Sequence, residues 1–200
     1  MTRGGQTRRL IVGISGASGV IMAARLLRAL RERPEIETQL VVTDGAWENF
    51  RAETSLTRTE VEALADVCYD SHDLAAPIAS GTYETLGMLV LPCSMKTLAG
   101  LVTGYSDNLL LRAGDVCLKE GRPLVLVPRE TPLSRLHLRK LKEAADLGMT
   151  IVPPMLSFYS GATTVEQQVD QILGKALRFF GIDYAPFVTW QGSGRQDMMH

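Results

Sequence analysis

A glycine-rich turn at residues 13–19 is the first place in the chain where residue types and spacing could do chemistry. It reads Gly-Ile-Ser-Gly-Ala-Ser-Gly, follows a short apolar run and precedes a stretch with helical spacing. Small residues let the backbone approach a phosphate, and the start of a helix offers free N–H groups and a favourable dipole. The dinucleotide fingerprint G-x-G-x-x-G is not matched, because Ile14 stands where its first glycine belongs. The turn therefore indicates either a mononucleotide site or a tight strand-to-helix turn that binds nothing.

A second turn rich in hydrogen-bond donors follows a later apolar run. It covers residues 92–97 and reads Pro-Cys-Ser-Met-Lys-Thr. Its hydroxyls and the ammonium of Lys96 could cradle a phosphate or the edge of a flavin. Ser94 could instead act only as the N-cap of a helix. Two such turns after two strands favour a ligand more than either turn does alone.

Other charged and aromatic residues stand where a ligand could reach them, and each also has an ordinary structural explanation. Arg129 and Glu130 directly follow an apolar run, either at the ligand edge of a sheet or as a surface ion pair. Arg112 and Lys119 are seven residues apart and face one way on a helix, as residues of a solvated face also do. Tyr159 follows a Pro-Pro pair, in a loop that could close over a site or simply lie at the surface.

Several signatures of other chemistry are missing from the sequence. The three cysteines and three histidines are scattered, without a CxxC pair. This argues against a disulfide scaffold or a zinc site and fits a reducing compartment. The sequence has no aspartate-rich DDxxD motif to hold magnesium on a diphosphate, and no GxSxG nucleophile motif. We therefore expect a protein that uses no metal.

The composition indicates a soluble protein that binds neither nucleic acid nor membrane. Of 200 residues, 46% are hydrophobic and 22% are charged, and the net charge is -1. The polar start, and apolar runs far shorter than the ~20 residues of a spanning helix, predict a cytoplasmic location. The length predicts one domain over residues 1–200, with an ordered core at about 9–192 and frayed ends.

Short apolar runs alternate with helical patterns along the chain. Strands are expected at residues 10–14, 38–42, 88–91, 124–127 and 150–152. Helices are expected at residues 20–33, 46–52, 98–102, 109–119, 134–147 and about 164–180, with capping boxes at Thr57 and Thr164. Strands that are apolar throughout predict an α/β, three-layer Rossmann-like fold, in which helices flank a parallel sheet. Ligands of such sheets bind beyond the carboxyl ends of the strands, where the turns described above lie.

Taken together and in this order, the motifs resemble the flavin prenyltransferases of the UbiX type. The resemblance extends over about residues 9–192 and includes the tail Trp190-Gln191-Gly192. It is carried by residues 13–19, 92–98, 112–120, 124–132 and 153–159. Within the family, the chain is most similar to the branch associated with phenolic acid decarboxylases.

The resemblance implies a flavoprotein fold, noncovalently bound FMN and no metal. Dimethylallyl monophosphate would supply a five-carbon unit that is joined to N5 and C6 of reduced FMN. The product, prenylated FMN, would pass to a UbiD-type decarboxylase. The resemblance also implies a homo-oligomer, a dodecamer with flavin at the subunit interfaces.

Site residues follow from the resemblance, position by position. It implies catalytic roles for Ser15, Glu53, Lys119 and Glu130. It implies FMN contacts for Gly16, Ala17, Ser18, Thr43, Ser94, Met95, Lys96, Thr97, Arg112 and Arg129. It implies contacts with dimethylallyl phosphate for Lys119, Arg129, Tyr159, Lys175 and Trp190. The cations would stabilise the departing phosphate, while Glu53 and Ser15 would steer protons around N5 and C6. Thr43 stands where the family usually has serine. Lys175 stands where many relatives have arginine, and lysine keeps the charge but lacks the planar fork that binds phosphate at two places.

Three other functions stay open at this point. A flavin-dependent cysteine decarboxylase of the same fold has a similar second turn, but it depends on a histidine near the flavin, which neither His72 nor His137 supplies. A non-catalytic FMN carrier subunit of a decarboxylase would have no need of Glu53 or Tyr159. An NAD-binding reductase could use Asp44 for the ribose, but the sequence lacks the first glycine of the fingerprint and a tyrosine–lysine proton donor.

Overall fold

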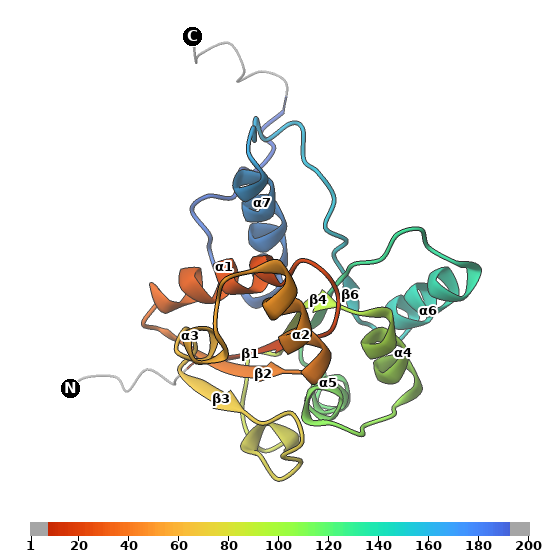
Figure 1. The fold of residues 1–200 in the computed structure, drawn as a ribbon. Helices are drawn as coiled ribbons and strands as arrows, with labels where there is room; N and C mark the ends of the chain where they lie inside the picture. The colour runs from red at the N-terminus through yellow and green to blue at the C-terminus, as the bar shows by residue number, and fades with distance from the viewer. Residues whose placement is uncertain (1–7, 193–200) are drawn as a thin grey trace, which may run out of the picture.

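The structure, a computed structural model, describes residues 8–192 (Figure 1). The predicted frayed ends lie outside these residues. The strands are β1 (Arg8–Ile14), β2 (Ile36–Val42), β3 (Val67–Tyr69), β4 (Met88–Cys93), β5 (Leu124–Pro128) and β6 (Thr150–Ile151). The α-helices are α1 (Val20–Arg31), α2 (Asp44–Glu53), α3 (Arg58–Glu62), α4 (Met95–Thr103), α5 (Leu109–Lys119), α6 (Arg135–Asp146) and α7 (Val165–Leu177). Two 3-10 helices are η1 (Pro77–Ala79) and η2 (Arg178–Phe180).

The strands form one parallel sheet in the order β3-β2-β1-β4-β5-β6. The chain builds outward from β1 to β3 and then returns to β4, on the other side of β1. The strand order therefore reverses between β1 and β4, and the carboxyl ends of these neighbours flank the crevice where such sheets bind ligands. The glycine-rich turn follows the end of β1, and the second turn singled out in the sequence follows the end of β4. The predicted α/β fold is confirmed.

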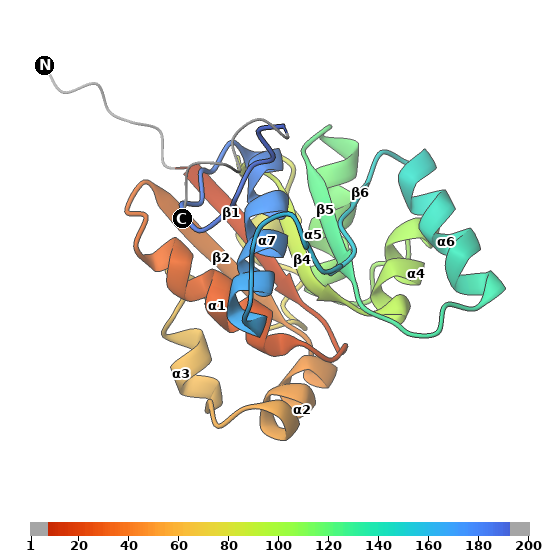
Figure 2. The same ribbon diagram turned by 90° about the horizontal axis from the view of Figure 1, so that it is seen from above.

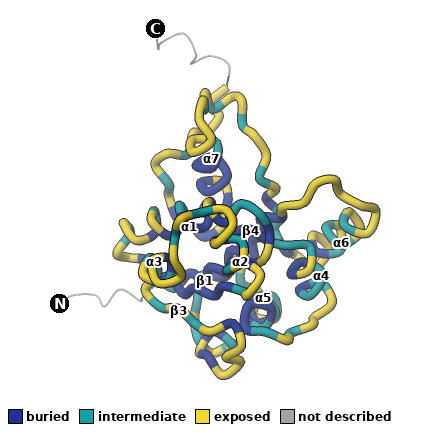
Figure 3. The backbone as a smooth tube through the Cα atoms, in the orientation of Figure 1, coloured by how far each residue is buried: buried dark blue, intermediate teal, exposed yellow. Residues whose placement is uncertain are grey.

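Helices cover both faces of the sheet (Figure 2). On one face α1, α2 and α7 pack around a core that includes Leu26, Phe50 and Leu173. On the other face η1, α4 and α5 pack around a core that includes Leu98 and Leu110. Figure 3 shows buried strands and inner helix faces, in contrast to the segment between β6 and α7, which is largely exposed. We call this segment, residues 152–164, the β6–α7 loop.

Most element boundaries agree with those expected from the sequence. The five expected strands are present, each within two residues at either end. The third strand was not predicted, because three residues around the exposed Cys68 give no readable pattern. Helix α4 begins at Met95, earlier than predicted, because Ser94 caps it. The predicted capping boxes at Thr57 and Thr164 both form. Over residues 8–192, none of the helices combines the length and apolarity that crossing a membrane requires.

Candidate functional site

The side chain of Ser15 lies at the carboxyl end of β1, beside β4, where the strand order reverses. Its hydroxyl donates to the carbonyl oxygen of Pro92 at 3.0 Å and accepts from the N–H of Ser94 at 2.8 Å. The backbone N–H of Ser15 also donates to the Pro92 oxygen, at 3.2 Å. The side chain is fully buried. Ser15 therefore joins the two turns, and its hydroxyl already acts as both donor and acceptor within the protein.

The glycine-rich turn is shaped by a close backbone contact and by one left-handed residue. A Cβ on Gly16 would lie 3.1 Å from the carbonyl carbon of Gly45, so the turn lies directly against the start of α2. Gly19 has φ 100°, a conformation that favours glycine. As the N-cap of α1 it has no side chain to accept from the first helical turn, so a bound anion can take that place. Of the two alternatives that the sequence left open for this turn, the geometry fits the phosphate-binding one.

Two residues of the next strand–helix unit reach the same turn. Glu53, the last residue of α2, accepts a hydrogen bond from the N–H of Gly19 through Oε2 at 2.7 Å. Thr43 donates its N–H to the carbonyl oxygen of Ile14 at 3.0 Å, and its side chain makes no capping bond to α2. A carboxylate and a hydroxyl, supplied by the two ends of one helix, therefore stand beside the crevice.

The second turn forms the N-terminus of α4. Ser94 accepts from the N–H of Thr97 at 3.2 Å, and its hydroxyl donates to the Thr97 Oγ1 at 3.1 Å. The N-cap role considered from the sequence is therefore confirmed. Lys96 is exposed and Met95 is half-buried beside it. Because β1 and β4 are parallel neighbours, the N-termini of α1 and α4 meet at one edge of the sheet.

Arg129 directly follows β5 at this edge of the sheet, and it lines a hollow of about 410 Å³. The hollow lies between the start of α1 and the β6–α7 loop, and it is lined by residues of the glycine-rich turn, of this loop and of α7. They include Ser18, Gly19, Arg129, Pro154 and Thr164. The guanidinium thus shares one hollow with the glycine-rich turn, as an anion-binding group would have to do.

Arg129 and Glu130 do not form the surface ion pair that the sequence left open. The backbone N–H of Arg129 donates to the carbonyl oxygen of Cys93 at 3.2 Å, which fixes the residue at the end of β5. The Glu130 carboxylate accepts from the N–H of Thr131 at 3.0 Å, and in the described chain no ion pair joins it to Arg129. The Arg129 side chain is exposed and available to a ligand.

A second hollow, of about 590 Å³, lies between the β6–α7 loop, α7 and the tail that follows η2. It brings Tyr159, Lys175 and Trp190 together, and the rings of Tyr159 and Trp190 pack edge to face with centroids 5.7 Å apart. Among the described residues that line it, the charged ones are Lys175 and Arg178, so the hollow is cationic as well as aromatic. Sequence reasoning missed Arg178, although its spacing of three residues from Lys175 on a helix was an available signal.

The two hollows adjoin, because Leu156 and Ile172 line both of them. An elongated ligand could therefore extend from the glycine-rich turn towards the aromatic pair. One side of this path is α7, and the other is the β6–α7 loop. The position of α7 consequently decides how the two parts of the site are arranged.

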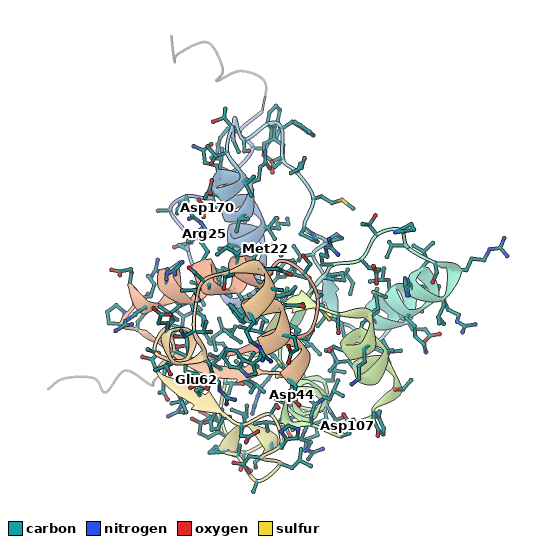
Figure 4. All side chains as sticks on the ribbon, viewed as in Figure 1. Met22, Arg25, Asp44, Glu62, Asp107 and Asp170 are labelled. Atoms are coloured by element: carbon teal, nitrogen blue, oxygen red, sulfur yellow. The ribbon has the colours of Figure 1, made fainter. Side chains whose placement is uncertain are left out.

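Helix α7 is fixed to α1 by an ion pair between Asp170 and Arg25 (Figure 4). Arg25 donates to both carboxylate oxygens of the buried Asp170, at 2.6 and 2.7 Å, and the Tyr184 hydroxyl donates to the same group at 2.6 Å. Burial raises the pKa of Asp170, but these hydrogen bonds outweigh it and hold the pKa below its usual 3.8. Burial together with the Asp170 contact raises the pKa of Tyr184 to about 12. The helix that carries Lys175 is thus tied to the helix that begins at the glycine-rich turn.

Arg112 and Lys119 lie in the other helical layer. Both belong to α5, which packs on the face of the sheet opposite to α7. Arg112 pairs with Asp115 at 2.7 Å, and Lys119 pairs with Glu120 at 3.6 Å. One chain therefore does not bring Lys119 to the hollow that contains Lys175. If these two lysines act in one site, they come from different subunits.

His72 lies closer to the ligand edge than the sequence indicated. It follows β3 in a polar loop, and its Nε2 is 3.5 Å from Oδ2 of Asp44, the first residue of α2. Its Nδ1 is 3.1 Å from Oδ1 of Asp70. His137 lies in the capping box of α6, in the other helical layer. Within residues 8–192, no three histidine, cysteine or acidic side chains are placed to hold a metal ion.

Comparison with known proteins identifies the family. A model of the Flavoprotein family matches residues 2–177. The chain is 53% identical to a probable UbiX-like flavin prenyltransferase of Sedimentibacter hydroxybenzoicus, over 92% of this chain and 98% of that protein. It is 49% identical to the flavin prenyltransferase UbiX of Escherichia coli strain K12, over 93% of this chain and 100% of that protein. The chain belongs to the UbiX-type flavin prenyltransferases.

Solved structures agree with this assignment. A dodecameric FMN-dependent UbiX-like decarboxylase from Escherichia coli O157:H7 matches with a TM-score of 0.89 and 47% identity, over 92% of this chain and 100% of that one. AnUbiX (PadA1), solved in complex with FMN and dimethylallyl pyrophosphate, matches with a TM-score of 0.90 and 43% identity, over 94% and 99% of the two chains. The FMN-dependent cysteine decarboxylase TvaF is 15% identical with a TM-score of 0.63, a likeness that concerns the fold alone.

Proposed function

We propose that this chain is a cytoplasmic flavin prenyltransferase. It joins the dimethylallyl group of dimethylallyl monophosphate to N5 and C6 of reduced FMN, without a metal, and passes the prenylated FMN to a UbiD-type decarboxylase. The observation that carries the proposal is the pair of adjoining hollows, one at a phosphate cradle and one both aromatic and cationic, in a chain about half identical to named flavin prenyltransferases.

The crevice between β1 and β4 is the FMN end of the site. Gly16, Ala17 and Ser18 hold FMN through backbone groups at the start of α1, where a helix N-terminus favours an anion. The remaining contacts come from neighbouring strand ends. They are Thr43, Ser94, Met95, Lys96, Thr97 and Arg129. Reduced FMN supplies the electron-rich N5 and C6 atoms. The chain's part is to orient the flavin edge towards the second hollow.

The second hollow is the prenyl phosphate end. Tyr159 and Trp190 wall the apolar five-carbon unit, and Lys175 binds the phosphate together with Arg129. As the allylic C–O bond breaks, negative charge grows on the phosphate, and fixed cations stabilise it most at that moment. Arg178 adds a second cation to the same hollow and partly replaces the guanidinium that Lys175 lacks.

Proton handling is assigned to Glu53 and Ser15, while the resemblance to the family assigns Glu130 to the dimethylallyl phosphate. Glu53 stands at the glycine-rich turn, where it accepts from Gly19, and it can take up a proton released at the flavin edge. Ser15 donates to the Pro92 oxygen, so it can pass a proton only if that hydrogen bond exchanges. Ser15 therefore acts chiefly by holding the two turns at a fixed separation.

Lys119 and Arg112 are assigned to the site of a neighbouring subunit. They lie on α5, across the sheet from α7, so they meet Tyr159 and Lys175 only between chains. The proposed assembly is a dodecamer with flavin at its interfaces. The dodecameric relative, which is 47% identical to this chain over its full length, supports this assembly.

One assay tests the function. The purified protein is reduced with FMN without oxygen, dimethylallyl monophosphate is added, and the flavin is analysed by mass spectrometry. We expect a flavin heavier by one dimethylallyl unit. A parallel sample with dimethylallyl diphosphate shows which phosphate the site accepts. Bound FMN of unchanged mass in both samples would contradict the proposal and would fit a carrier subunit or a cysteine decarboxylase.

A further inference from the structure

Two glutamines on one face of α7 each hold an extended segment that carries an aromatic ring of the second hollow. We propose that Gln168 and Gln171 are positioning residues, which hold Tyr159 and Trp190 against each other and so shape the prenyl end of the site. Residues three apart on a helix share a face. The inference rests on the proposed function, because that function gives the two rings a substrate.

Gln168 ties α7 to the β6–α7 loop through its side-chain amide. Its Oε1 accepts from the N–H of Ser157 at 2.8 Å, and its Nε2 donates to the carbonyl oxygens of Ser157 and Ala162, both at 3.3 Å. The amide thus spans the two ends of the short segment that contains Tyr159. None of the residues from Ser157 to Ala162 is buried, so packing contributes little and the hydrogen bonds hold the segment.

Gln171 makes the corresponding contacts with the tail. Its Nε2 donates to the carbonyl oxygen of Pro186 and its Oε1 accepts from the N–H of Val188, both at 3.1 Å. Gln171 is 6% exposed, so these bonds satisfy a buried amide that would otherwise be costly. Trp190 follows two residues after Val188. The direction of the tail at the hollow is therefore set by Gln171.

The tail also rests directly on the next turn of the helix. A Cβ on Gly174 would lie 2.2 Å from the Cβ of Phe187, so only a glycine lets the tail approach this closely. With both segments held by one helix face, the rings of Tyr159 and Trp190 meet edge to face at 5.7 Å. A shift of either segment would separate them. Glutamine suits this task, because one planar amide carries both a donor and an acceptor for an extended backbone.

The test uses Gln168→Met and Gln171→Met, which keep the length of the side chain and remove its hydrogen bonds. The chain has two tryptophans, so a Trp47→Phe background makes Trp190 the sole tryptophan, which can be excited selectively over the tyrosines. We expect acrylamide quenching of Trp190 to rise about twofold in either variant, because the ring loses its partner. We also expect kcat/KM for the prenyl phosphate to fall roughly 10-fold, with the affinity for FMN unchanged.

Gln167→Met is the matched control, because this glutamine caps α7 and contacts Thr163 and Thr164 rather than the segment that contains Tyr159. It should leave the quenching of Trp190 unchanged. In a Tyr159→Leu background, adding either glutamine change should lower kcat/KM by less than about twofold more, since coupled residues are not additive.

Two results would overturn the proposal. One is unchanged quenching of Trp190 in both glutamine variants. The other is a full additional loss of kcat/KM when the glutamine changes are added to Tyr159→Leu. If the parent chain formed no prenylated flavin, the proposed function would fail, yet the quenching experiment would still decide whether the glutamines position the rings.

Discussion

Among residues 8–192, Glu53 is held at the glycine-rich turn by one hydrogen bond, which it accepts from the N–H of Gly19 at 2.7 Å. Glu53→Gln keeps an oxygen that can accept this bond but cannot take up a proton. We expect FMN affinity within about threefold of the parent chain. We expect the second new bond, the carbon–carbon bond at flavin C6, to form roughly 100-fold more slowly. Single-turnover absorbance and mass spectrometry would measure both steps. An unchanged rate for the second bond would remove Glu53 from proton handling.

Lys175 presents a point charge where a planar fork would bind phosphate at two places. Lys175→Arg should therefore lower KM for dimethylallyl monophosphate by roughly threefold, since bidentate charge-assisted bonds are stronger. Lys175→Met should raise KM at least ~10-fold, because it removes one of the cations that line the hollow. Initial rates over a range of prenyl phosphate concentrations would show both changes. If KM were the same in all three proteins, phosphate would not bind at residue 175.

At the residue scale, the sequence could indicate ligand contacts but not the residues that support them. Tyr159, Lys175 and Trp190 were inferred from a family resemblance, and they do line one hollow. Gln168 and Gln171 were not found from the sequence, because the role of a glutamine depends on which backbone segment lies within hydrogen-bond distance of its side-chain amide. That backbone belongs to segments that no local pattern places against α7.

At the scale of elements, the ion pair between α1 and α7 predicts how stability depends on pH. The pKa of Asp170 is lower in the folded chain than its usual 3.8, so the folded state binds this proton less readily than the unfolded state does. The stabilisation is therefore fully present above the unfolded pKa and is lost as the pH falls through the lower, folded pKa. We expect Asp170→Asn to lower the free energy of unfolding by about 2 kcal/mol at pH 7, and by less below pH ~3.8.

Urea unfolding at pH 7 and at several acidic pH values would measure this difference. Asp146→Asn is the matched control, because Asp146 pairs with Lys142 on the exposed side of α6. An exposed pair contributes little, so this variant should change the free energy of unfolding by less than about 0.5 kcal/mol. Equal effects of the two substitutions at pH 7 would contradict the importance assigned to the contact between α1 and α7.

Elements were predictable wherever a local signal was strong. Capping boxes at Thr57 and Thr164 are local, because the cap and its partner are three residues apart, and both form. The short strand β3 gave no such signal, since it exists through its pairing with β2. The order of the strands was also not readable, because no local pattern states that β4 returns to lie beside β1.

At the scale of the molecule, the cationic residues assigned to one reaction lie on both faces of the sheet. Tyr159 and Lys175 belong to the side of α7, whereas Lys119 belongs to α5 on the opposite side. A closed, symmetric assembly can resolve this, because each subunit then presents its α5 face to the α7 side of a neighbour. The site would then be complete only at an interface between two chains. Mixing subunits that carry different substitutions tests whether Lys119 and Lys175 come from different chains.

With the prenyl phosphate well below its KM, Lys119→Ala and Lys175→Ala should each keep at most about a tenth of the parent activity, because each removes a cation from every site. Co-expressed in equal amounts, the two variants should regain about a quarter of the parent activity. In a random assembly, about a quarter of the sites combine an intact Lys119 from one chain with an intact Lys175 from its neighbour. The control combines Lys175→Ala with Tyr159→Ala, which removes the ring that walls the five-carbon unit in the same hollow. Both residues line one hollow of one chain, so no mixed site has both intact, and no activity should return. Recovery in the control, or none in the first mixture, would show that Lys119 and Lys175 do not act across an interface.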